Sequence, residues 1–258
     1  MSEWDPQLAH LGGRSLYGSM LRVVTAVGGK VKGCLWYQGE SDTTGDADPA
    51  YYGKFKTFVE SVRRDLRDER LPFVYAQLGP VMTPLGMELG WPEQTQWNRV
   101  QHDQLRLERE FPAAVLVPTI DAKLDDFIHL STDSLRVVGD RMASAALRIA
   151  YGRPAAEAGP RLAGAEWNED RTELLLSFSG MNDAFRPVGR VFGFHVFHGE
   201  EALPCTAMLT ADRRRIVVRI AQAAPDSCSL WHGKGLNPAV NAKDELGYPL
   251  VVFGPVPV

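Results

Sequence analysis

The sequence has few cysteines and none of the spacings on which cysteine-based sites depend. Its three cysteines, Cys34, Cys205 and Cys228, lie far apart, and no Cys-x-x-Cys pair occurs. An odd number of isolated thiols excludes a disulfide framework and gives no zinc-binding pattern. A chain of 258 residues is long enough to fold around an apolar core without either.

The sequence also lacks long apolar runs and a surplus of positive charge. No stretch approaches the roughly 18 apolar residues that a membrane-spanning helix needs. The opening residues 1–6 lack the basic and then apolar pattern of a secretory signal. The formal net charge of −4 favours neither phosphate backbones nor anionic lipid. We therefore expect a soluble chain without nucleic-acid or membrane partners, in a compartment that the sequence leaves open.

The first half of the chain alternates short apolar runs with helical patterns. The runs at 31–37, 73–78 and 114–120 predict buried strands. Elsewhere apolar residues recur every three or four positions, which predicts helices at 49–66, 97–111 and 132–149, the last capped by Thr132 and ended by Gly152 and Pro154. This βαβαβ order indicates a parallel sheet covered by helices.

The second half has a different character. Short apolar runs separated by Gly, Asp, Asn and Pro turns predict strands at 174–178, 191–197, 216–220, 228–231 and 250–253. The sequence therefore predicts an α/β domain over residues 1–154 and a β-rich module over residues 155–258.

Polar side chains follow the first and third predicted strands. Ligands of an open α/β sheet bind beyond the carboxyl ends of its strands, so these segments are the expected place for chemistry. The first strand leads to Gln38, Gly39 and Glu40, and the third leads to Asp126 and His129. A spacing of three lets the carboxylate accept a hydrogen bond from the imidazole and fix its tautomer. Each motif alone arises often by chance, and it is their shared placement that indicates a site.

Several segments together resemble the sialate O-acetylesterases and the related acetylxylan-esterase-type carbohydrate esterases, which are SGNH (GDSL-like) hydrolases. The most specific of them is Trp36-Tyr-Gln-Gly-Glu-Ser-Asp42. The others are Leu16-Tyr-Gly-Ser-Met20, Pro72-Phe-Val-Tyr-Ala-Gln-Leu78, Ile128-His-Leu-Ser-Thr132, Val138-Gly-Asp-Arg-Met-Ala143, Trp231-His-Gly-Lys-Gly-Leu-Asn-Pro-Ala-Val-Asn241 and Gly247-Tyr-Pro-Leu250. The resemblance implies a three-layer α/β/α sandwich and the removal of O-acetyl groups from carbohydrates.

The resemblance also implies roles for individual residues in an acyl-enzyme mechanism that needs no metal and no cofactor. His129 would be the general base and Asp126 its partner, with Glu40 a closely ranked alternative that would orient the histidine instead of, or alongside, Asp126. The Gln38 amide and the Gly39 backbone would bind the oxyanion. Such a family member would act on an acetylated carbohydrate.

The nucleophile that the resemblance implies has no clear counterpart. Gly13-Arg-Ser15-Leu16 has the outline of the family's Gly-x-Ser-Leu block, but no apolar strand precedes it, and Ser15 is expected to cap a helix instead. We therefore expect an N-terminally incomplete domain in which the 31–37 strand is an edge. Such an edge favours self-association or pairing with a separate N-terminal segment. The competing interpretation is a degenerate esterase that binds sugar without catalysis.

The aromatic and remaining histidine residues offer weaker signals. Tyr37 and Trp91 are predicted to contact substrate, the latter from the loop at 79–92, whereas buried tryptophans are commoner in cores. His195 and His198 would project to opposite faces of a strand and so would not share a metal. His102 is expected to be a solvated helix residue.

Overall fold

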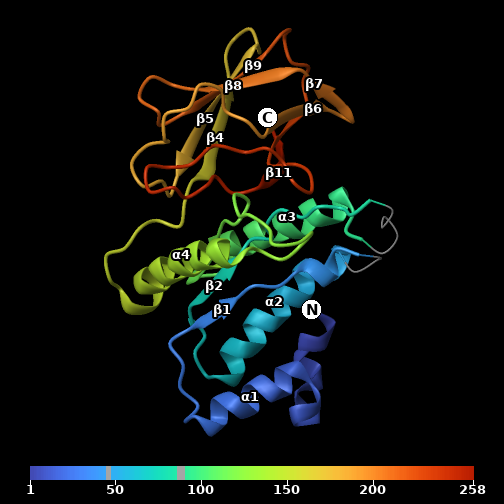
Figure 1. Cartoon of the computed structure of the whole chain (residues 1–258), viewed down its shortest axis with the longest axis vertical. Helices are drawn as coiled ribbons and strands as arrows, with labels where there is room; N and C mark the ends of the chain where they lie inside the picture. The colour runs from blue at the N-terminus through green and yellow to red at the C-terminus, as the bar shows by residue number, and fades with distance from the viewer. Residues whose placement is uncertain (45–47, 86–90) are drawn as a thin grey trace.

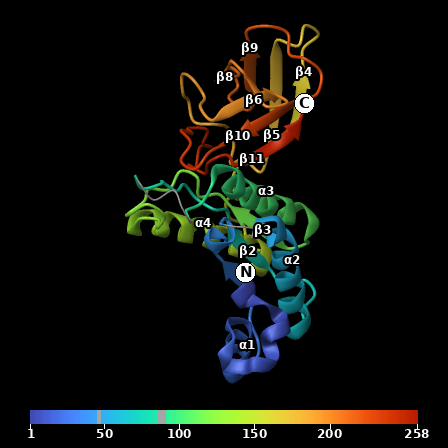
Figure 2. The ribbon, with the colours of Figure 1, turned by 90° about the vertical axis from the view of Figure 1, so that its right-hand side faces the viewer.

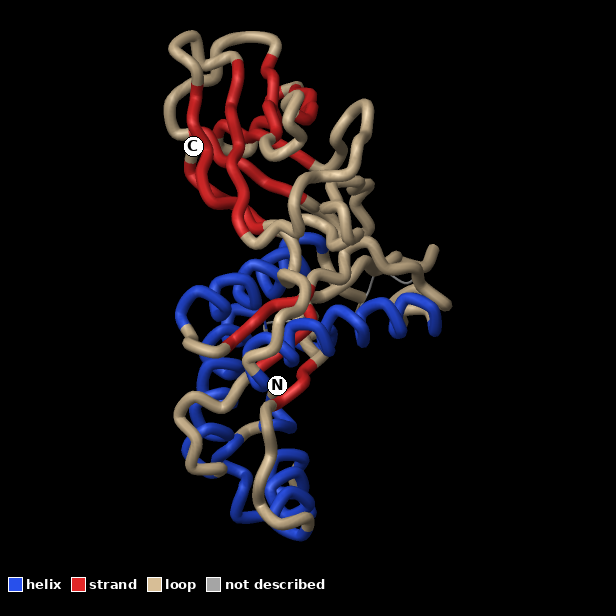
Figure 3. The backbone as a smooth tube through the Cα atoms, turned by 90° about the vertical axis from the view of Figure 1, so that its left-hand side faces the viewer, coloured by secondary structure: helices blue, strands red, loops and turns tan. Residues whose placement is uncertain are grey.

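The computed structural model describes residues 1–44, 48–85 and 91–258. The molecule is elongated, with an antiparallel β-rich module at one end, a helical N-terminal segment at the other, and a parallel sheet between helices in the middle (Figure 1). Figure 3 shows the same division, with strands dominating one end and helices the other.

The parallel sheet contains β1 (Cys34–Trp36), β2 (Phe73–Ala76) and β3 (Ala114–Val117) in the order β1-β2-β3. Cys34 pairs with Phe73, which in turn pairs with Ala114. All three strands are shorter than the apolar runs predicted. At the first of them, residues 31–33 are exposed and leave the ladder. The prediction of a parallel α/β arrangement is correct for the described residues, and the strand lengths were overestimated.

Helices cover both faces of this sheet. α4 (Thr132–Tyr151) packs Val138 and Met142 against residues of β2 and β3, which form one buried cluster. α2 (Asp48–Asp65) and α3 (Gln94–Glu110) lie on the other face, where they form a second, aromatic-rich cluster with strand residues. Ser131, and not Thr132 as predicted, caps α4, because its hydroxyl accepts from the backbone N–H of Ser134 at 3.2 Å.

The N-terminal segment consists of the 3₁₀ helices η1 (Ser2–Trp4) and η2 (Pro6–Arg14), followed by α1 (Leu16–Ala26). Ser15 is the N-cap of α1, as predicted: its Oγ accepts from the Gly18 N–H at 3.0 Å and donates to the Leu8 carbonyl at 2.8 Å. The Ser15 hydroxyl therefore both accepts and donates a hydrogen bond within the N-terminal segment.

The β-rich module is built of two antiparallel four-stranded sheets with the orders β11-β10-β6-β7 and β4-β5-β9-β8. Their strands are β4 (Arg161–Trp167), β5 (Glu173–Ser179), β6 (Phe194–His198), β7 (Glu201–Leu203), β8 (Cys205–Leu209), β9 (Ile216–Ile220), β10 (Cys228–His232) and β11 (Phe253–Pro257). Four of the predicted strands overlap β5, β6, β9 and β10, whereas β4, β7 and β8 were not predicted.

The predicted strand at 250–253 is wrong except for its last residue, because β11 begins at Phe253. The backbone of Val252 is instead bound to a side chain of the other half: its N–H donates to Gln77 Oε1 at 2.9 Å, and its carbonyl accepts from Gln77 Nε2 at 2.8 Å. An apolar, buried residue therefore joins the two halves of the chain and is not part of a ladder. Figure 2 shows β11 lying above α3 at this junction.

Charged side chains also join the two halves. Arg161 on β4 reaches Glu108 on α3 at 2.9 Å and donates to the carbonyl of Leu116 on β3. Asp121 binds both Arg141 at 2.8 Å and Lys243 at 2.7 Å. A domain boundary near Pro154 remains a prediction. No helix in the described part of the chain is both long and apolar enough to span a bilayer.

Candidate active site

The carboxyl ends of β1 and β2 are held together by one buried side chain of α3. Gln104 Oε1 accepts from the Leu78 N–H at 2.8 Å, while its Nε2 donates to the Gln38 carbonyl at 3.3 Å. Gly39 follows with a φ of 154°, and a Cβ there would lie 3.2 Å from Leu78 Cδ2 and from Val100 Cγ1. Glycine is therefore needed for this loop to lie against α3.

The segments after β2 and β3 meet at the same edge. The Met82 N–H donates to the Phe127 carbonyl at 2.8 Å. The turn that contains Phe127 is closed by a hydrogen bond of 3.0 Å from the Asp125 N–H to the His129 carbonyl, and by an isolated bridge between Leu124 and Leu130. The structure thus brings the segments that carry Gln38 and His129 to one edge of the sheet, as the sequence predicts.

Asp126 and His129 form a hydrogen-bonded pair at the tip of this turn. Asp126 Oδ2 lies 2.6 Å from His129 Nδ1, and its Oδ1 accepts from the backbone N–H groups of His129 at 2.7 Å and Ile128 at 2.8 Å. These donors, the His129 N–H first, lower the pKa of Asp126 to about 2. The carboxylate is therefore ionised at neutral pH.

The same hydrogen bond and the charge of Asp126 raise the pKa of His129, and Glu40 adds a smaller contribution. Because Nδ1 faces Asp126, the ring can present Nε2 as the proton acceptor. Nε2 has no hydrogen-bond partner within residues 1–44, 48–85 and 91–258. The side chain of His129 is 79% exposed and that of Asp126 is 51% exposed, so the pair is open to a substrate and to water.

Glu40, the alternative partner of the histidine, is engaged elsewhere. Its carboxylate accepts from the Gly39 N–H at 2.9 Å, and it affects His129 through charge alone. In this structure the carboxylate that touches the histidine is Asp126.

Both predicted oxyanion donors are occupied. Gln38 Nε2 donates to Asp42 Oδ2 at 2.7 Å, and the Gly39 N–H is bound by Glu40. Asp42 is only 3% exposed and also accepts from the Met1 amino group at 2.5 Å. Gln38 Oε1 is buried without a partner in the described part of the chain. An oxyanion hole at this position requires the Gln38 amide or the Glu40 carboxylate to turn.

Comparisons with known proteins show to which family the chain belongs. A model of the family described as carbohydrate esterase, sialic acid-specific acetylesterase, matches residues 1–148. The chain belongs to this family. The matched residues include the three parallel strands and the Asp126–His129 pair.

The chain is also similar to solved structures. The chain is similar to XAC1771, a novel carbohydrate acetylesterase from Xanthomonas citri, with 27% identity and a TM-score of 0.78 over 95% of this chain. It spans 56% of the length of that protein. A protein from Arabidopsis thaliana is 23% identical, over 57% of this chain and 56% of its own, with a TM-score of 0.44. No curated protein matches the chain.

In the part of this family member that the structure describes, no hydroxyl nucleophile is hydrogen-bonded to the histidine. Among the described residues, the ring of His129 is bonded to Asp126 alone. Ser15 is committed to capping α1, with its Oγ bonded on both sides. These hydrogen bonds agree with the prediction that Ser15 caps a helix and is not the nucleophile.

The aromatic residues predicted at the substrate site are only partly accessible. Tyr37 is half-buried, and burial first, then Glu40, raises the pKa of its hydroxyl. Trp91 is half-buried against the core, with an indole N–H that is buried without a partner in the described chain. Of the predicted loop at 79–92, residues 86–90 lie outside the described residues. Trp97 is 1% exposed and donates to the Gly79 carbonyl at 3.0 Å, as a core tryptophan.

Sequence reasoning missed a row of buried amides that positions the loops of this family member. Asn98, Gln101 and Gln104 lie three residues apart on α3, and each is at most 2% exposed. Gln101 Nε2 donates to the Leu78 carbonyl at 2.8 Å, and Asn98 Oδ1 accepts from the Gly235 N–H at 2.9 Å. Amides repeated on a helix face that also carries Trp97 were a usable signal, since buried polar groups require partners.

The other histidines differ from expectation in part. His102 is half-buried, not solvated, and burial lowers its pKa. The backbone of Gly254, near the start of β11, interacts with the ring and opposes this shift. His195 and His198 are both exposed on β6, an inner strand that is flanked by β10 and β7.

Proposed function

We propose that this chain carries the general base, its carboxylate partner and the oxyanion-binding loop of a carbohydrate O-acetylesterase with an SGNH-type three-layer fold. The single observation that carries the proposal is the Asp126–His129 pair at the carboxyl edge of the parallel sheet. Family membership and the likeness to XAC1771 support it.

In the proposed reaction His129 Nε2 takes the proton of a serine hydroxyl as its oxygen attacks the acetyl carbonyl. Asp126 stabilises the imidazolium that forms, consistent with the raised pKa of His129. The imidazolium then gives its proton to the sugar oxygen as the ester bond breaks. A water molecule, deprotonated by the same histidine, releases acetate from the acyl-enzyme and restores the hydroxyl.

The proposed oxyanion donors are the Gln38 amide and the Gly39 N–H. They become available if the Gln38 side chain leaves Asp42 and the Glu40 carboxylate leaves Gly39. The negative oxygen of a bound tetrahedral intermediate competes for these donors better than a ground-state carbonyl does.

We further propose that the serine belongs to a segment outside this sequence, because no hydroxyl is bonded to His129 among the described residues. A strand beside β1, which is one of the two outer strands of the described sheet, would bring a following serine to the carboxyl edge where His129 lies. The same observation favours the second candidate function, a chain that binds acetylated carbohydrate without turning it over.

The test is the rate of acetate release from p-nitrophenyl acetate and from an acetylated oligosaccharide. The chain alone should show slow hydrolysis, by water activated at His129, and His129→Ala should lower it by about tenfold or more. Ser15→Ala should leave the rate unchanged. A rate that His129→Ala does not alter would overturn the proposed base, and binding of the oligosaccharide without any turnover would favour the second function.

A further inference from the structure

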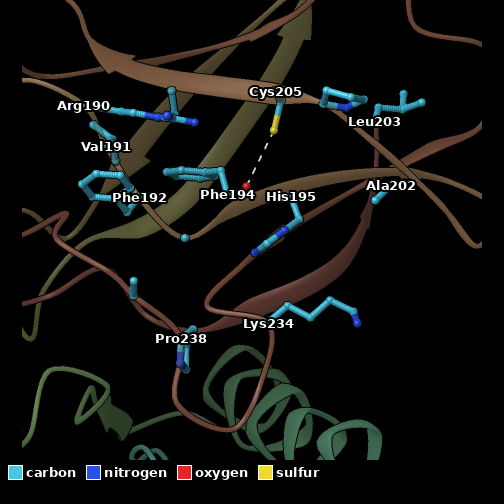
Figure 4. A pocket seen from close by; sticks show the side chains of 14 residues that line it. Arg190, Val191, Phe192, Phe194, His195, Ala202, Leu203, Cys205, Lys234 and Pro238 are labelled. Atoms are coloured by element: carbon cyan, nitrogen blue, oxygen red, sulfur yellow. Dashed lines mark hydrogen bonds between the residues drawn. The ribbon is translucent and has the colours of Figure 1, made fainter.

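The β-rich module has a cleft of its own, formed by β6, β8 and the loop after β10 (Figure 4). Its volume is about 650 Å³, within the range of small-molecule binding sites. The residues that give it chemical character are Arg190, Phe192, His195, Cys205, Lys234 and Pro238. None of these residues takes part in the site at the edge of the parallel sheet.

The charge of this cleft has one sign. Arg190 and Lys234 both line it, and no Asp or Glu does. Neither cation has an ion-pair partner in the parts of the chain that the structure describes. Lys234 Nζ instead lies 5.2 Å from the ring centre of Phe197 and 5.6 Å from that of Trp231. Aromatic faces hold the ammonium in place but do not neutralise it, which leaves the cleft able to attract an anion.

The remaining lining suits a sugar. Phe192 is 46% exposed and offers an aromatic face on which the C–H groups of a sugar ring can pack. His195 faces the cleft beside Lys234 (Figure 4). Partial desolvation, followed by the charge of Lys234, lowers its pKa, so the neutral ring can exchange hydrogen bonds with hydroxyls. The Cys205 thiol is turned to the Phe194 carbonyl at 3.7 Å, so it is directed at the backbone.

We propose that this cleft binds a carboxylated sugar unit of the glycan on which the chain acts. Arg190 and Lys234, which lie on opposite sides of the cleft (Figure 4), would attract the carboxylate, with the ring against Phe192 and a hydroxyl on His195. The proposal rests on the proposed function only in taking the ligand to be a carbohydrate. It adds a docking site, separate from the ester, that selects acidic glycans.

The cleft is connected to the Asp126–His129 turn through two backbone contacts. The loop that carries Lys234 continues to Leu236, whose carbonyl accepts from the Val81 N–H at 2.8 Å. The next residue, Met82, donates to the Phe127 carbonyl inside the turn. The loops that carry Lys234, Val81 and Phe127 therefore lie in a row between the cleft and the histidine. A ligand that reaches both places must be a glycan of several units, because a single sugar is too short.

Isothermal titration calorimetry with tetragalacturonate and a neutral tetrasaccharide, at fixed low salt, tests the proposal. The acidic ligand should bind about tenfold or more tightly than the neutral one. Lys234→Gln and Arg190→Gln should each remove most of that preference, and added salt should weaken the acidic ligand alone. Arg215→Gln, an exposed arginine of the same module outside the cleft, is the matched control and should bind like the unmodified chain.

Equal binding of the two ligands, or acidic binding that neither cleft variant weakens, would overturn the proposal. His129→Ala separates this failure from failure of the esterase function, because it should bind tetragalacturonate with unchanged affinity. Intact binding of tetragalacturonate, together with a rate of p-nitrophenyl acetate hydrolysis that His129→Ala does not alter, would contradict the esterase function and leave the cleft proposal standing.

Discussion

At the scale of single residues, the site depends on one short turn in which Asp126 makes three hydrogen bonds. Two of its donors are backbone N–H groups, so the carboxylate stays fixed whatever the protonation state of the ring. The histidine carries a raised pKa because its charged form is the one that Asp126 favours.

The first prediction concerns the titration of this ring. Asp126→Asn should lower the pKa of His129, because the substitution removes the negative charge that stabilises the imidazolium. NMR titration of the ring protons measures this directly. In a pH–rate profile, the rise that accompanies deprotonation of the base should move to lower pH, and its plateau should fall because the ring is less well oriented.

Glu40→Gln is the control for this prediction. Glu40 acts on His129 only through charge, so its removal should lower the pKa of the ring by less than Asp126→Asn does. A larger effect of Glu40→Gln would assign the orienting role to Glu40 and contradict the geometry of the turn.

At the scale of elements, the two outer strands of the parallel sheet differ in protection. On β3, the Leu116 N–H donates to Glu108 at 2.8 Å, and the Leu116 carbonyl accepts from Arg161. These two side chains hydrogen-bond the backbone groups of Leu116 that an additional strand would need for pairing. On β1, the Cys34 N–H donates to the Pro72 carbonyl at 2.8 Å on the β2 side, so the N–H of the next residue, Leu35, points away from β2. Leu35 is 62% exposed. The side of β1 away from β2 is therefore open to pairing.

The second prediction is that the purified chain associates through β1. Light scattering at increasing protein concentration should show a rising apparent mass, and Leu35→Lys should reduce it, because a lysine on an edge opposes pairing. Leu246→Lys, at a leucine 60% exposed in the β-rich module, is the matched control and should leave association unchanged. A monomer at all concentrations would contradict the prediction.

The elements also show which parts of the fold a sequence can specify. β2 was predictable because all four of its residues are buried, which produces an unbroken apolar run. β4 was missed because its sequence, with Gly164 and Ala165 at the centre, has no clear alternation. The Asp126–His129 hydrogen bond was predictable because the two residues are three positions apart in the sequence. The hydrogen bond from the Gln38 amide to Asp42 was not, because it depends on the path of the whole loop.

At the scale of the whole molecule, the two halves are joined by buried polar groups as well as by apolar packing. Gln77 is fully buried, and its amide makes two hydrogen bonds to Val252 and one, at 3.1 Å, to the carbonyl of Gln101. Such a network stabilises the junction only while every member has a partner. Removing the amide leaves several buried backbone groups unsatisfied.

The third prediction follows from this junction. Gln77→Met keeps the side-chain volume but removes the hydrogen bonds, so it should lower the free energy of unfolding by about 3 kcal/mol. Urea unfolding followed by fluorescence and by circular dichroism measures the change. Gln222→Met, at an exposed glutamine, should change stability by less than about 0.5 kcal/mol. If Gln77→Met lowers the free energy of unfolding as little as the control does, the junction does not depend on this amide.

Val81 and Met82 donate their neighbouring N–H groups in opposite directions, one to Leu236 in the β-rich module and the other to Phe127 beside the histidine. These two amide protons are therefore reporters on two different contacts, one with the β-rich module and one with the histidine turn, separated by a single peptide unit. Deuterium exchange at Val81 measures how often the module lifts from the sheet, and exchange at Met82 measures how often the histidine turn opens. If a glycan spans both places, it should slow the two exchange rates together, whereas a ligand confined to the module should slow the Val81 proton alone.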